Sequence, residues 1–441
     1  MKIFFILFIF IFLQNCSFDN KTGIWNNSGS IEVADERFKD FKTLNNEKKS
    51  FNQIIEPVDN FKPNLEKILI NFKWNDEFYN DSNNSKNFSY DGFNKIVYKS
   101  KRLSKYAVNK KILFQDNHVI IADVRGNITV YSITDKEIVF RFNFYKKKIK
   151  KNKKILSLII ENEIIYVADN LGYLYAINFI EKKIIWAQNY KIPFRSNLKI
   201  FKNKLILANQ DNSLFIINKL DGVKKKTIPT EELMLKNNFI NSLAKYGENI
   251  FFLNTFGSLY SINATNNNFN WFINLNTFLD SSVNNFFNSN PLIINKDYIF
   301  IATNPYLYVL NKTNGLTKFR MLTTSTIKPI ASADQLFFIN ENTLLVSLDI
   351  GSGKVNFSLD INKKVSNFLK TKNKKTITVK SFSLVNNNLL LFLDNSYIVE
   401  FNLKGKILKI DKLPSKLNSL PIFIDNSILY LDNKNKLTIL N

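Results

Sequence analysis

The sequence predicts an all-β fold, an eight-bladed β-propeller. Three observations support it: a repeated hairpin motif, a steady spacing of its copies, and an N-terminal strand without a copy of its own. The clearest copy covers residues 164–186, where two apolar strands flank a turn over residues 169–172. Asp169 opens this turn, because its side chain can accept hydrogen bonds from the backbone two residues on. Gly172 suits the positive φ of a tight hairpin, and Trp186 offers an apolar plate for packing against a neighbouring unit.

Eight copies of the motif follow one another along the chain. They open at residues 123, 169, 209, 254, 302, 340, 394 and 432. The mean step is roughly 44 residues, which is the typical length of one four-stranded propeller blade. An aromatic residue stands eight positions after the tenth residue of the motif in five copies, as Phe140, Trp186, Trp271, Phe319 and Phe357. Chance recurrence in an Asn-rich chain does not readily produce this pattern.

The two ends of the repeat array complement each other. The segment 94–99 resembles the closing strand of a copy although no copy precedes it, and the last copy stops at Asn441 before its own closing strand. We therefore expect the early strand to complete the last blade, since a closed ring has no large open edge. On this interpretation, deletion of residues 1–90 should leave a folded ring and deletion of residues 1–105 should strongly destabilise it.

Two long connections interrupt the regular spacing. Residues 362–380, between the sixth and seventh copies, predict a long loop or an extra hairpin, and residues 224–238 predict a second long connection. Loops on a rigid ring are the usual places for binding sites.

The region before the ring divides into three parts. Residues 1–15 predict a signal peptide, because a positive start precedes eleven apolar residues, too few to span a bilayer. The next residue, Cys16, follows a segment that resembles a bacterial lipobox, with Leu13 in the expected place but Asn15 a poor match. An ordinary signal peptide with an incidental Cys is the alternative. Residues 16–64 predict a flexible tether, and residues 65–93 form a lead-in segment that could contain a strand or a short helix.

Composition limits the chemistry. The 61 Lys and Arg residues exceed the 37 Asp and Glu residues, for a formal net charge of +24. Such a surface suits anionic lipid, nucleic acid or an acidic protein, although Lys-rich and Asn-rich composition can also reflect an AT-rich genome. The chain has one Cys and one His, His118, so an intrachain disulfide and a Cys/His metal cluster are excluded. We expect no nucleic acid, metal or cofactor.

The repeats resemble those of pyrroloquinoline-quinone (PQQ) enzymes, whose blades end in a Gly-x-x-x-Trp-like element. That element is present here from Gly315 to Phe319 and from Gly353 to Phe357. Eight such blades behind a lipoprotein-like start resemble one family in particular, BamB, the propeller lipoproteins of the outer-membrane β-barrel assembly machinery. The resemblance implies a non-enzymatic scaffold lipoprotein on the periplasmic face of the outer membrane. It would bind the barrel protein BamA and assist insertion of β-barrel proteins, as a monomer within a larger complex.

The resemblance also implies an interface. After the second blade the family carries an apolar-Arg-small segment that contacts BamA, and this sequence has Phe194 and Arg195 there, between Pro193 and Ser196. Phe194 would be the apolar anchor and Arg195 the charged anchor, as suits an interface hot spot. An ordinary loop between blades with a solvent-facing Arg is the alternative. We expect an exposed loop whose truncation removes binding without lowering thermal stability.

Two other functions remain open. A PQQ-dependent dehydrogenase would have similar repeats, but the sequence lacks an adjacent Cys pair and a recognisable acidic cluster. An envelope propeller could instead bind another periplasmic protein or a polyanionic ligand, because a fold does not determine a function. Residues 351–354, Gly-Ser-Gly-Lys, resemble the end of a phosphate-binding loop, but they lack its upstream Gly and its strand-to-helix context, which favours a simple turn.

Overall fold

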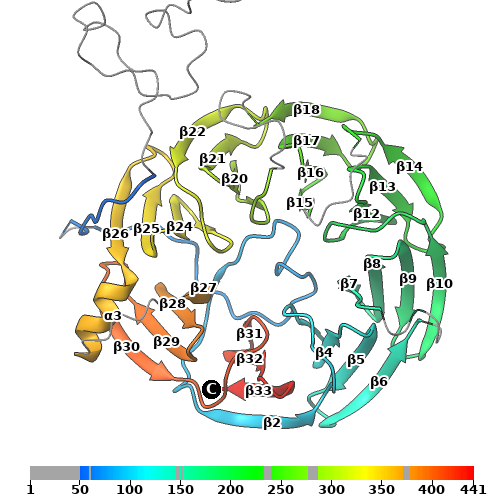
Figure 1. Ribbon diagram of the computed structural model, residues 1–441, viewed down its shortest axis with the longest axis horizontal. Helices are drawn as coiled ribbons and strands as arrows, with labels where there is room; N and C mark the ends of the chain where they lie inside the picture. Colours follow the sequence, from blue (N-terminus) through cyan, green and yellow to red (C-terminus); the bar gives the residue numbers. More distant parts are fainter. Residues whose placement is uncertain are drawn as a thin grey trace, which may run out of the picture. The chain divides into compact units, whose positions relative to one another are not determined.

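The computed structural model describes residues 50–58, 61–145, 149, 152–232, 240–276, 287–370 and 377–441. The chain separates into two compact units, residues 1–48 and 49–441, and the first unit lies outside the described residues. In the second unit eight sheets surround a common centre, seven with four strands and one with five (Figure 1). The predicted eight-bladed β-propeller is therefore confirmed.

Blades 1 to 6 each use four consecutive strands, while blades 7 and 8 also take in β1 and β2; the strands of blades 1 to 6 are named here from the inner strand outward. Blade 1 contains β3 (Leu113–Gln115), β4 (His118–Ala122), β5 (Asn127–Ser132) and β6 (Glu137–Asn143). Blade 2 contains β7 (Leu156–Glu161), β8 (Ile164–Asp169), β9 (Tyr173–Asn178) and β10 (Lys183–Asn189). Blade 3 contains β11 (Lys199–Phe201), β12 (Lys204–Ala208), β13 (Leu214–Asn218) and β14 (Lys224–Ile228). Blade 4 contains β15 (Ser242–Tyr246), β16 (Asn249–Leu253), β17 (Ser258–Asn263) and β18 (Phe269–Asn274).

The second half of the ring repeats this order. Blade 5 contains β19 (Ile293–Ile294), β20 (Tyr298–Ala302), β21 (Tyr306–Asn311) and β22 (Thr317–Leu322). Blade 6 contains β23 (Ile330–Ser332), β24 (Gln335–Ile339), β25 (Leu344–Asp349) and β26 (Val355–Asp360). Blade 7 contains β27 (Val379–Val385), β28 (Asn388–Leu393), β29 (Tyr397–Phe401) and β30 (Ile407–Lys412), with β1 (Asn87–Phe88) added at its inner edge. Blade 8 contains β31 (Ile422–Ile424), β32 (Ser427–Leu431), β33 (Lys436–Leu440) and β2 (Ile96–Arg102).

The first residue of each motif lies at the turn between the second and third strands of its blade. In six of the eight copies its Oδ1 accepts hydrogen bonds of 2.8–3.1 Å from the backbone N–H groups two and four residues on. The exceptions are the copies that open at Ala302 and Asp394. The repeated Asp or Asn is therefore a structural cap that sets each hairpin.

The aromatic residues of the outer strands connect neighbouring blades. Trp186 of β10 donates its Nε1–H to the Lys219 carbonyl of blade 3 at 2.9 Å, and Trp271 of β18 repeats this contact with blade 5. A Cβ on Gly222 would come within 2.4 Å of the Trp186 ring, so the next blade accepts the ring only because this position is Gly. The predicted role of Trp186 in packing against a neighbouring unit is correct.

The closure of the ring is also as predicted. β2 pairs antiparallel with β33, from Ile96 opposite Leu440 to Arg102 opposite Lys436. The first strand of the ring thus becomes the outer strand of the blade that holds the C-terminus. Apolar residues of adjacent sheets pack together between the blades, so each such interface has its own apolar core.

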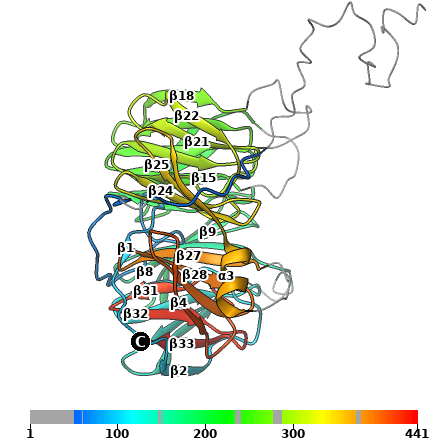
Figure 2. The ribbon, with the colours of Figure 1, turned by 90° about the vertical axis from the view of Figure 1, so that its left-hand side faces the viewer.

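Three expectations about the connections were wrong. The segment 362–380 contains the helix α3 (Ile361–Leu369) rather than a hairpin, because Asp360 caps its start through a 3.0 Å hydrogen bond from Lys363 N–H. Residues 224–228 are the strand β14 and not part of a loop. Residues 50–58, expected in the tether, lie along blade 6, where Ile55 forms an antiparallel bridge with Ser358 of β26. Figure 2 shows the ring edge-on, with β1 near one face and α3 toward the other.

Candidate functional site

The lead-in segment lies in the centre of the ring and contacts the inner strand of every blade (Figure 1). As the chain advances from residue 71 to residue 88, it meets blades 8, 1, 2, 3, 4, 5, 6 and 7 in that order. We call residues 71–90 the plug. Main-chain bonds carry many of these contacts: Trp74 exchanges two with Phe114 of β3, and Ser82 O accepts one from Ile294 of β19 at 3.0 Å. The plug closes the circle of inner strand edges that would otherwise lack partners.

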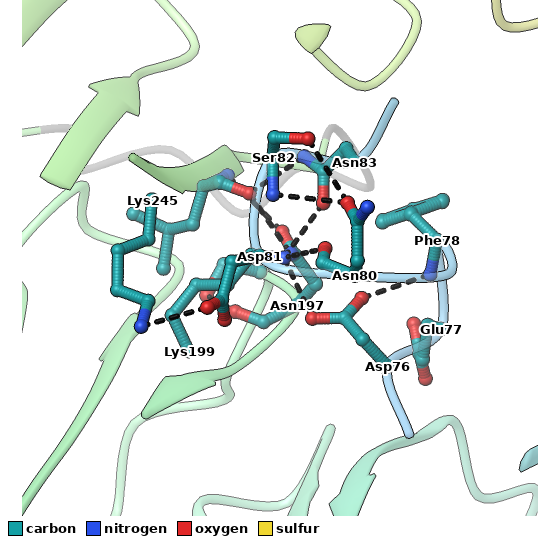
Figure 3. A network of polar contacts seen from close by, with 12 residues as sticks. Asp76, Glu77, Phe78, Asn80, Asp81, Ser82, Asn83, Asn197, Lys199 and Lys245 are labelled. Atoms are coloured by element: carbon teal, nitrogen blue, oxygen red, sulfur yellow. Dashed lines mark hydrogen bonds and ion pairs between the residues drawn. The ribbon is translucent and has the colours of Figure 1, made fainter. Parts of the chain in front are cut away.

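A buried ion pair lies at the middle of the plug (Figure 3). Lys199 of β11 is fully buried, and its Nζ lies 2.6 Å from the Asp76 carboxylate. The same ammonium donates to Asn80 O at 2.9 Å and to Asn83 Oδ1 at 2.7 Å. Asn83 in turn donates to the Leu243 and Leu292 carbonyls of blades 4 and 5. One lysine therefore joins three residues of the plug to blade 3.

Two further lysines contact the plug. Lys111 pairs with Glu77 at 2.7 Å, and Glu77 also accepts a 3.1 Å hydrogen bond from the Leu158 N–H of β7. Lys328 donates to Asn83 O, to Phe78 O and to Ser85 Oγ. Burial lowers the pKa of Lys328 to about 7; Asp76 opposes the shift, while Lys199 and Lys111 add to it. Lys199, Lys111 and Lys328 thus face two carboxylates, those of Asp76 and Glu77, and Lys199 and Lys328 also donate to backbone carbonyls of the plug.

Aromatic side chains anchor the plug against blades 8 and 1. Trp74, Tyr79 and Phe88 are buried together, with ring centroids 4.7 to 5.7 Å apart. Phe88 stacks on Phe423 of blade 8 at 5.3 Å. This packing belongs to the same core cluster as the inner strands of blades 8 and 1. The plug is therefore an integral part of the ring, which argues against the expectation that a ring lacking residues 1–90 stays folded.

The structure places the predicted interface residues differently from the expectation of an exposed loop. Phe194 is 5% exposed and packs against Phe215 and Tyr190 in the core between blades 2 and 3. Its N–H donates to Asp169 O at 3.0 Å. The prediction that Phe194 is an exposed apolar anchor is therefore wrong, because its ring fills the gap between two sheets. The contribution of Phe194 to binding stays a prediction.

Arg195 is half-buried beside Phe194. Its guanidinium reaches Gln210 Oε1 at 3.5 Å, while its buried Nε has no hydrogen-bond partner among the described residues. Burial lowers the pKa of this guanidinium. The Arg195 backbone N–H donates to the Ala208 carbonyl of blade 3 at 3.0 Å, and the Arg195 carbonyl accepts a bond of 2.9 Å from the N–H of Asn241, which directly precedes β15 of blade 4. Arg195 is thus a rigidly placed cation with unused hydrogen-bonding capacity.

Three other features were identified in the sequence: Cys16, His118 and residues 351–354. Cys16 lies outside the described residues. His118 begins β4 and packs against Phe179, with ring centroids 5.2 Å apart. Residues 351–354 form a turn in which Asp349 Oδ1 accepts bonds from the N–H and Oγ of Ser352, each at 2.7 Å. The phosphate-loop resemblance therefore describes a β-hairpin turn.

The described part of the chain has neither a cluster of metal ligands nor a helix that could span a membrane. It contains no group of three or more His, Cys, Asp or Glu side chains placed to hold a metal ion. Its helix is too short and too polar to cross a membrane, and no other described helix could do so.

The fold defines the class of protein. This chain is a PQQ-like repeat β-propeller: it has seven four-stranded blades and one five-stranded blade, a repeated Asp or Asn cap, and Trp residues docked on Gly of the next blade. The family model described as outer membrane protein assembly factor BamB matches residues 124–359, more than half of the chain. The chain belongs to this family.

Individual relatives are distant. The uncharacterized protein RC0314 of Rickettsia conorii is 24% identical over 294 residues, which are 61% of this chain and 67% of that protein. BamB from Moraxella catarrhalis has a TM-score of 0.61 and 13% identity, covering 78% of this chain and 98% of that structure. Quinohemoprotein alcohol dehydrogenase from Comamonas testosteroni has a TM-score of 0.62 and 9% identity, covering 83% and 80%. At these identities the solved structures establish the fold alone.

Proposed function

We propose that the protein is a non-enzymatic scaffold of the cell envelope that assists assembly of outer-membrane β-barrel proteins by binding a BamA-like barrel protein. The observation that carries this proposal is the match of residues 124–359 to the family described as outer membrane protein assembly factor BamB. The plug adds support, because the chain's own residues occupy the centre of the ring where a propeller enzyme could hold a ligand. A quinone-dependent dehydrogenase is the alternative that the fold alone leaves open.

The proposed partner contact centres on Arg195. The cation lies in the connection between blades 2 and 3, beside Gln210 of blade 3, and its buried Nε has no partner among the described residues. Because Arg195 is only half-buried, the exposed part of its guanidinium could donate to a partner carboxylate or carbonyl, and a charge-assisted hydrogen bond of this kind is stronger than a neutral one. Phe194 would support the contact from beneath by fixing the loop.

Co-purification in mild detergent tests the proposal. We expect the wild-type protein to retain a BamA-like protein from envelope extracts and the Arg195→Ala variant to retain much less. Truncation of an interface anchor typically costs about 2 kcal/mol of binding, a loss of roughly thirtyfold. The control is Lys191→Ala, an exposed cation in the same loop. Absence of a BamA-like protein from the wild-type eluate would contradict the proposal, and equal retention by both variants would exclude Arg195 from the contact.

Attachment to the membrane is proposed to depend on Cys16. Acylation of this residue would anchor the ring at the periplasmic face of the outer membrane. We expect labelled fatty acid to enter the wild-type protein, and Cys16→Ala to release the protein in soluble form. Failure of the wild type to incorporate the label would exclude the lipid anchor without affecting the partner proposal.

A further inference from the structure

The helix α3 is an addition to the repeated architecture. It lies on the outer rim of the ring, in the connection between blades 6 and 7, against β26 and β30 (Figure 1). Ile361 and Val365 are buried, while the side chains of Phe368 and Leu369 near the C-terminal end are 48% and 44% exposed. Blade closure is achieved by the β-sheets without this helix, so its exposed apolar end suggests a separate role.

An open groove of about 300 Å³ lies between α3 and the turn before β30. It is lined by Lys364, Phe368, Lys404, Gly405, Lys406 and Ile407. Ile407 is buried and contributes apolar surface, and Phe368 contributes an exposed aromatic ring. Gly405 has a φ of +69° and its missing Cβ would lie 2.2 Å from a Leu359 methyl, so the turn packs closely onto blade 6.

The charges around the groove are unequal. Three of its lining residues are lysines, and one of them, Lys364, has a carboxylate partner, Glu56, at 3.0 and 3.1 Å. Lys404 and Lys406 are exposed and form no ion pair within the described ranges. Glu56 follows Ile55, which exchanges backbone hydrogen bonds of 3.0 and 2.8 Å with Ser358. An extended chain that carries a carboxylate therefore already binds at this rim.

We propose that this groove binds a short extended segment of a partner protein in which a large apolar side chain is flanked by carboxylates. The apolar side chain would pack on Phe368 and Ile407, and the carboxylates would pair with Lys404 and Lys406. A volume of about 300 Å³ is at the small end of ligand pockets, which favours a linear segment over a folded domain. The site is distinct from the contact proposed at Arg195, and it requires no BamA-like protein.

Fluorescence anisotropy with two labelled peptides tests the site in the full-length protein. The first peptide is Gly-Asp-Glu-Phe-Asp-Glu-Gly, and the second has Ser in place of Phe. We expect the Phe peptide to bind at least tenfold more tightly. The double variant Lys404→Glu with Lys406→Glu should lower this affinity at least tenfold, and Phe368→Ser should reduce the difference between the peptides to less than threefold.

The matched control is Lys354→Glu. Lys354 is exposed and follows Gly353 in the corresponding turn of blade 6, just as Lys406 follows Gly405. We expect this variant to bind the Phe peptide within twofold of wild type, with melting temperatures of all variants unchanged. Equal affinity for the two peptides, or an equal loss in Lys354→Glu, would mean that the net positive charge alone attracts acidic peptides, and would overturn the proposal. Groove variants that reduce binding to phosphatidylglycerol vesicles but leave peptide affinity unchanged would also overturn it, in favour of a lipid surface.

Discussion

The ion pair between Lys199 and Asp76 allows a direct test of how strongly the plug holds the ring together. The side chains are 0% and 3% exposed, and the two charged atoms are 2.6 Å apart. Asp76→Asn removes the charge but keeps an oxygen that can accept the existing 2.9 Å hydrogen bond from Phe78 N–H. The substitution therefore isolates the electrostatic contribution. Lys199 would remain buried with only the neutral oxygens of Asn80 and Asn83.

The expected loss of stability is large. Removal of one partner of a buried pair leaves an uncompensated charge and typically costs about 3–5 kcal/mol. The control is Asp81→Asn, because Asp81 pairs with Lys245 at 2.7 Å but is 53% exposed, so we expect a loss of at most about 1 kcal/mol. Equilibrium urea denaturation followed by tryptophan fluorescence measures both, since Trp74 is buried within the plug and reports on its release.

A double variant separates the pair from its surroundings. Asp76→Asn with Lys199→Met removes both charges, and a buried pair replaced as a unit loses much less than a pair broken on one side. We expect the double variant to be more stable than Asp76→Asn alone by at least about 1 kcal/mol. A free energy of unfolding for Asp76→Asn within about 0.5 kcal/mol of that for Asp81→Asn would refute the conclusion that this buried pair secures the plug.

Three other predictions follow from burial. Phe194→Ala should lower the free energy of unfolding by about 3–5 kcal/mol, because it leaves a cavity between blades 2 and 3. Arg195→Ala should lower it by no more than about 1 kcal/mol. Equal losses of the two variants in urea denaturation would contradict this prediction. Lys328 has a folded pKa of about 7 against an ordinary value of 10.5, so the unfolded state binds more protons between these values and stability should rise with pH from 7 to 10. Lys328→Met lacks this titration, and parallel pH profiles of the two proteins would count against the assignment. Deletion of residues 1–48 should preserve cooperative unfolding and deletion of residues 1–90 should abolish it, which thermal denaturation followed by circular dichroism can decide.

The repeated parts of the fold were predictable because the same local hydrogen-bonding pattern recurs in most blades. Asp169 and its equivalents cap a hairpin whose N–H groups lie two and four residues away, so the signal is entirely local in sequence. Trp186 has a fixed place within its own copy of the motif, and a Gly in a turn of the next blade receives it. In blade 3 the Trp position is occupied by Lys226, whose Nζ donates to Asn267 O of blade 4 at 3.1 Å. A polar contact thus replaces the aromatic one without a change in the spacing of the blades.

The candidate site was less predictable because its contacts are distant in sequence. Residues 71–90 have no repeat and no sustained periodicity, because the segment passes from one blade to the next and its contacts change along the way. The aromatic residues Trp74, Tyr79 and Phe88 were the available signal, because a flexible segment rarely contains so many large apolar side chains. The prediction that Phe194 is exposed was wrong because it rested on a family resemblance and not on the residues around it. A resemblance assigned it to a loop, whereas its neighbour Asn209 in the next blade turns that loop into part of a sheet edge.

The order of contacts along the plug has a consequence for the stability of the whole ring. In a propeller without a plug, each blade contacts two neighbours, so a local opening at one blade interface can remain local. Here one continuous segment, residues 71–88, meets all eight inner strands in succession, and the same chain continues into β2, which closes blade 8. Opening of any interface that moves an inner strand must therefore also disturb the plug or the closing strand. The N-terminal part of the ring unit thus couples the blades to one another.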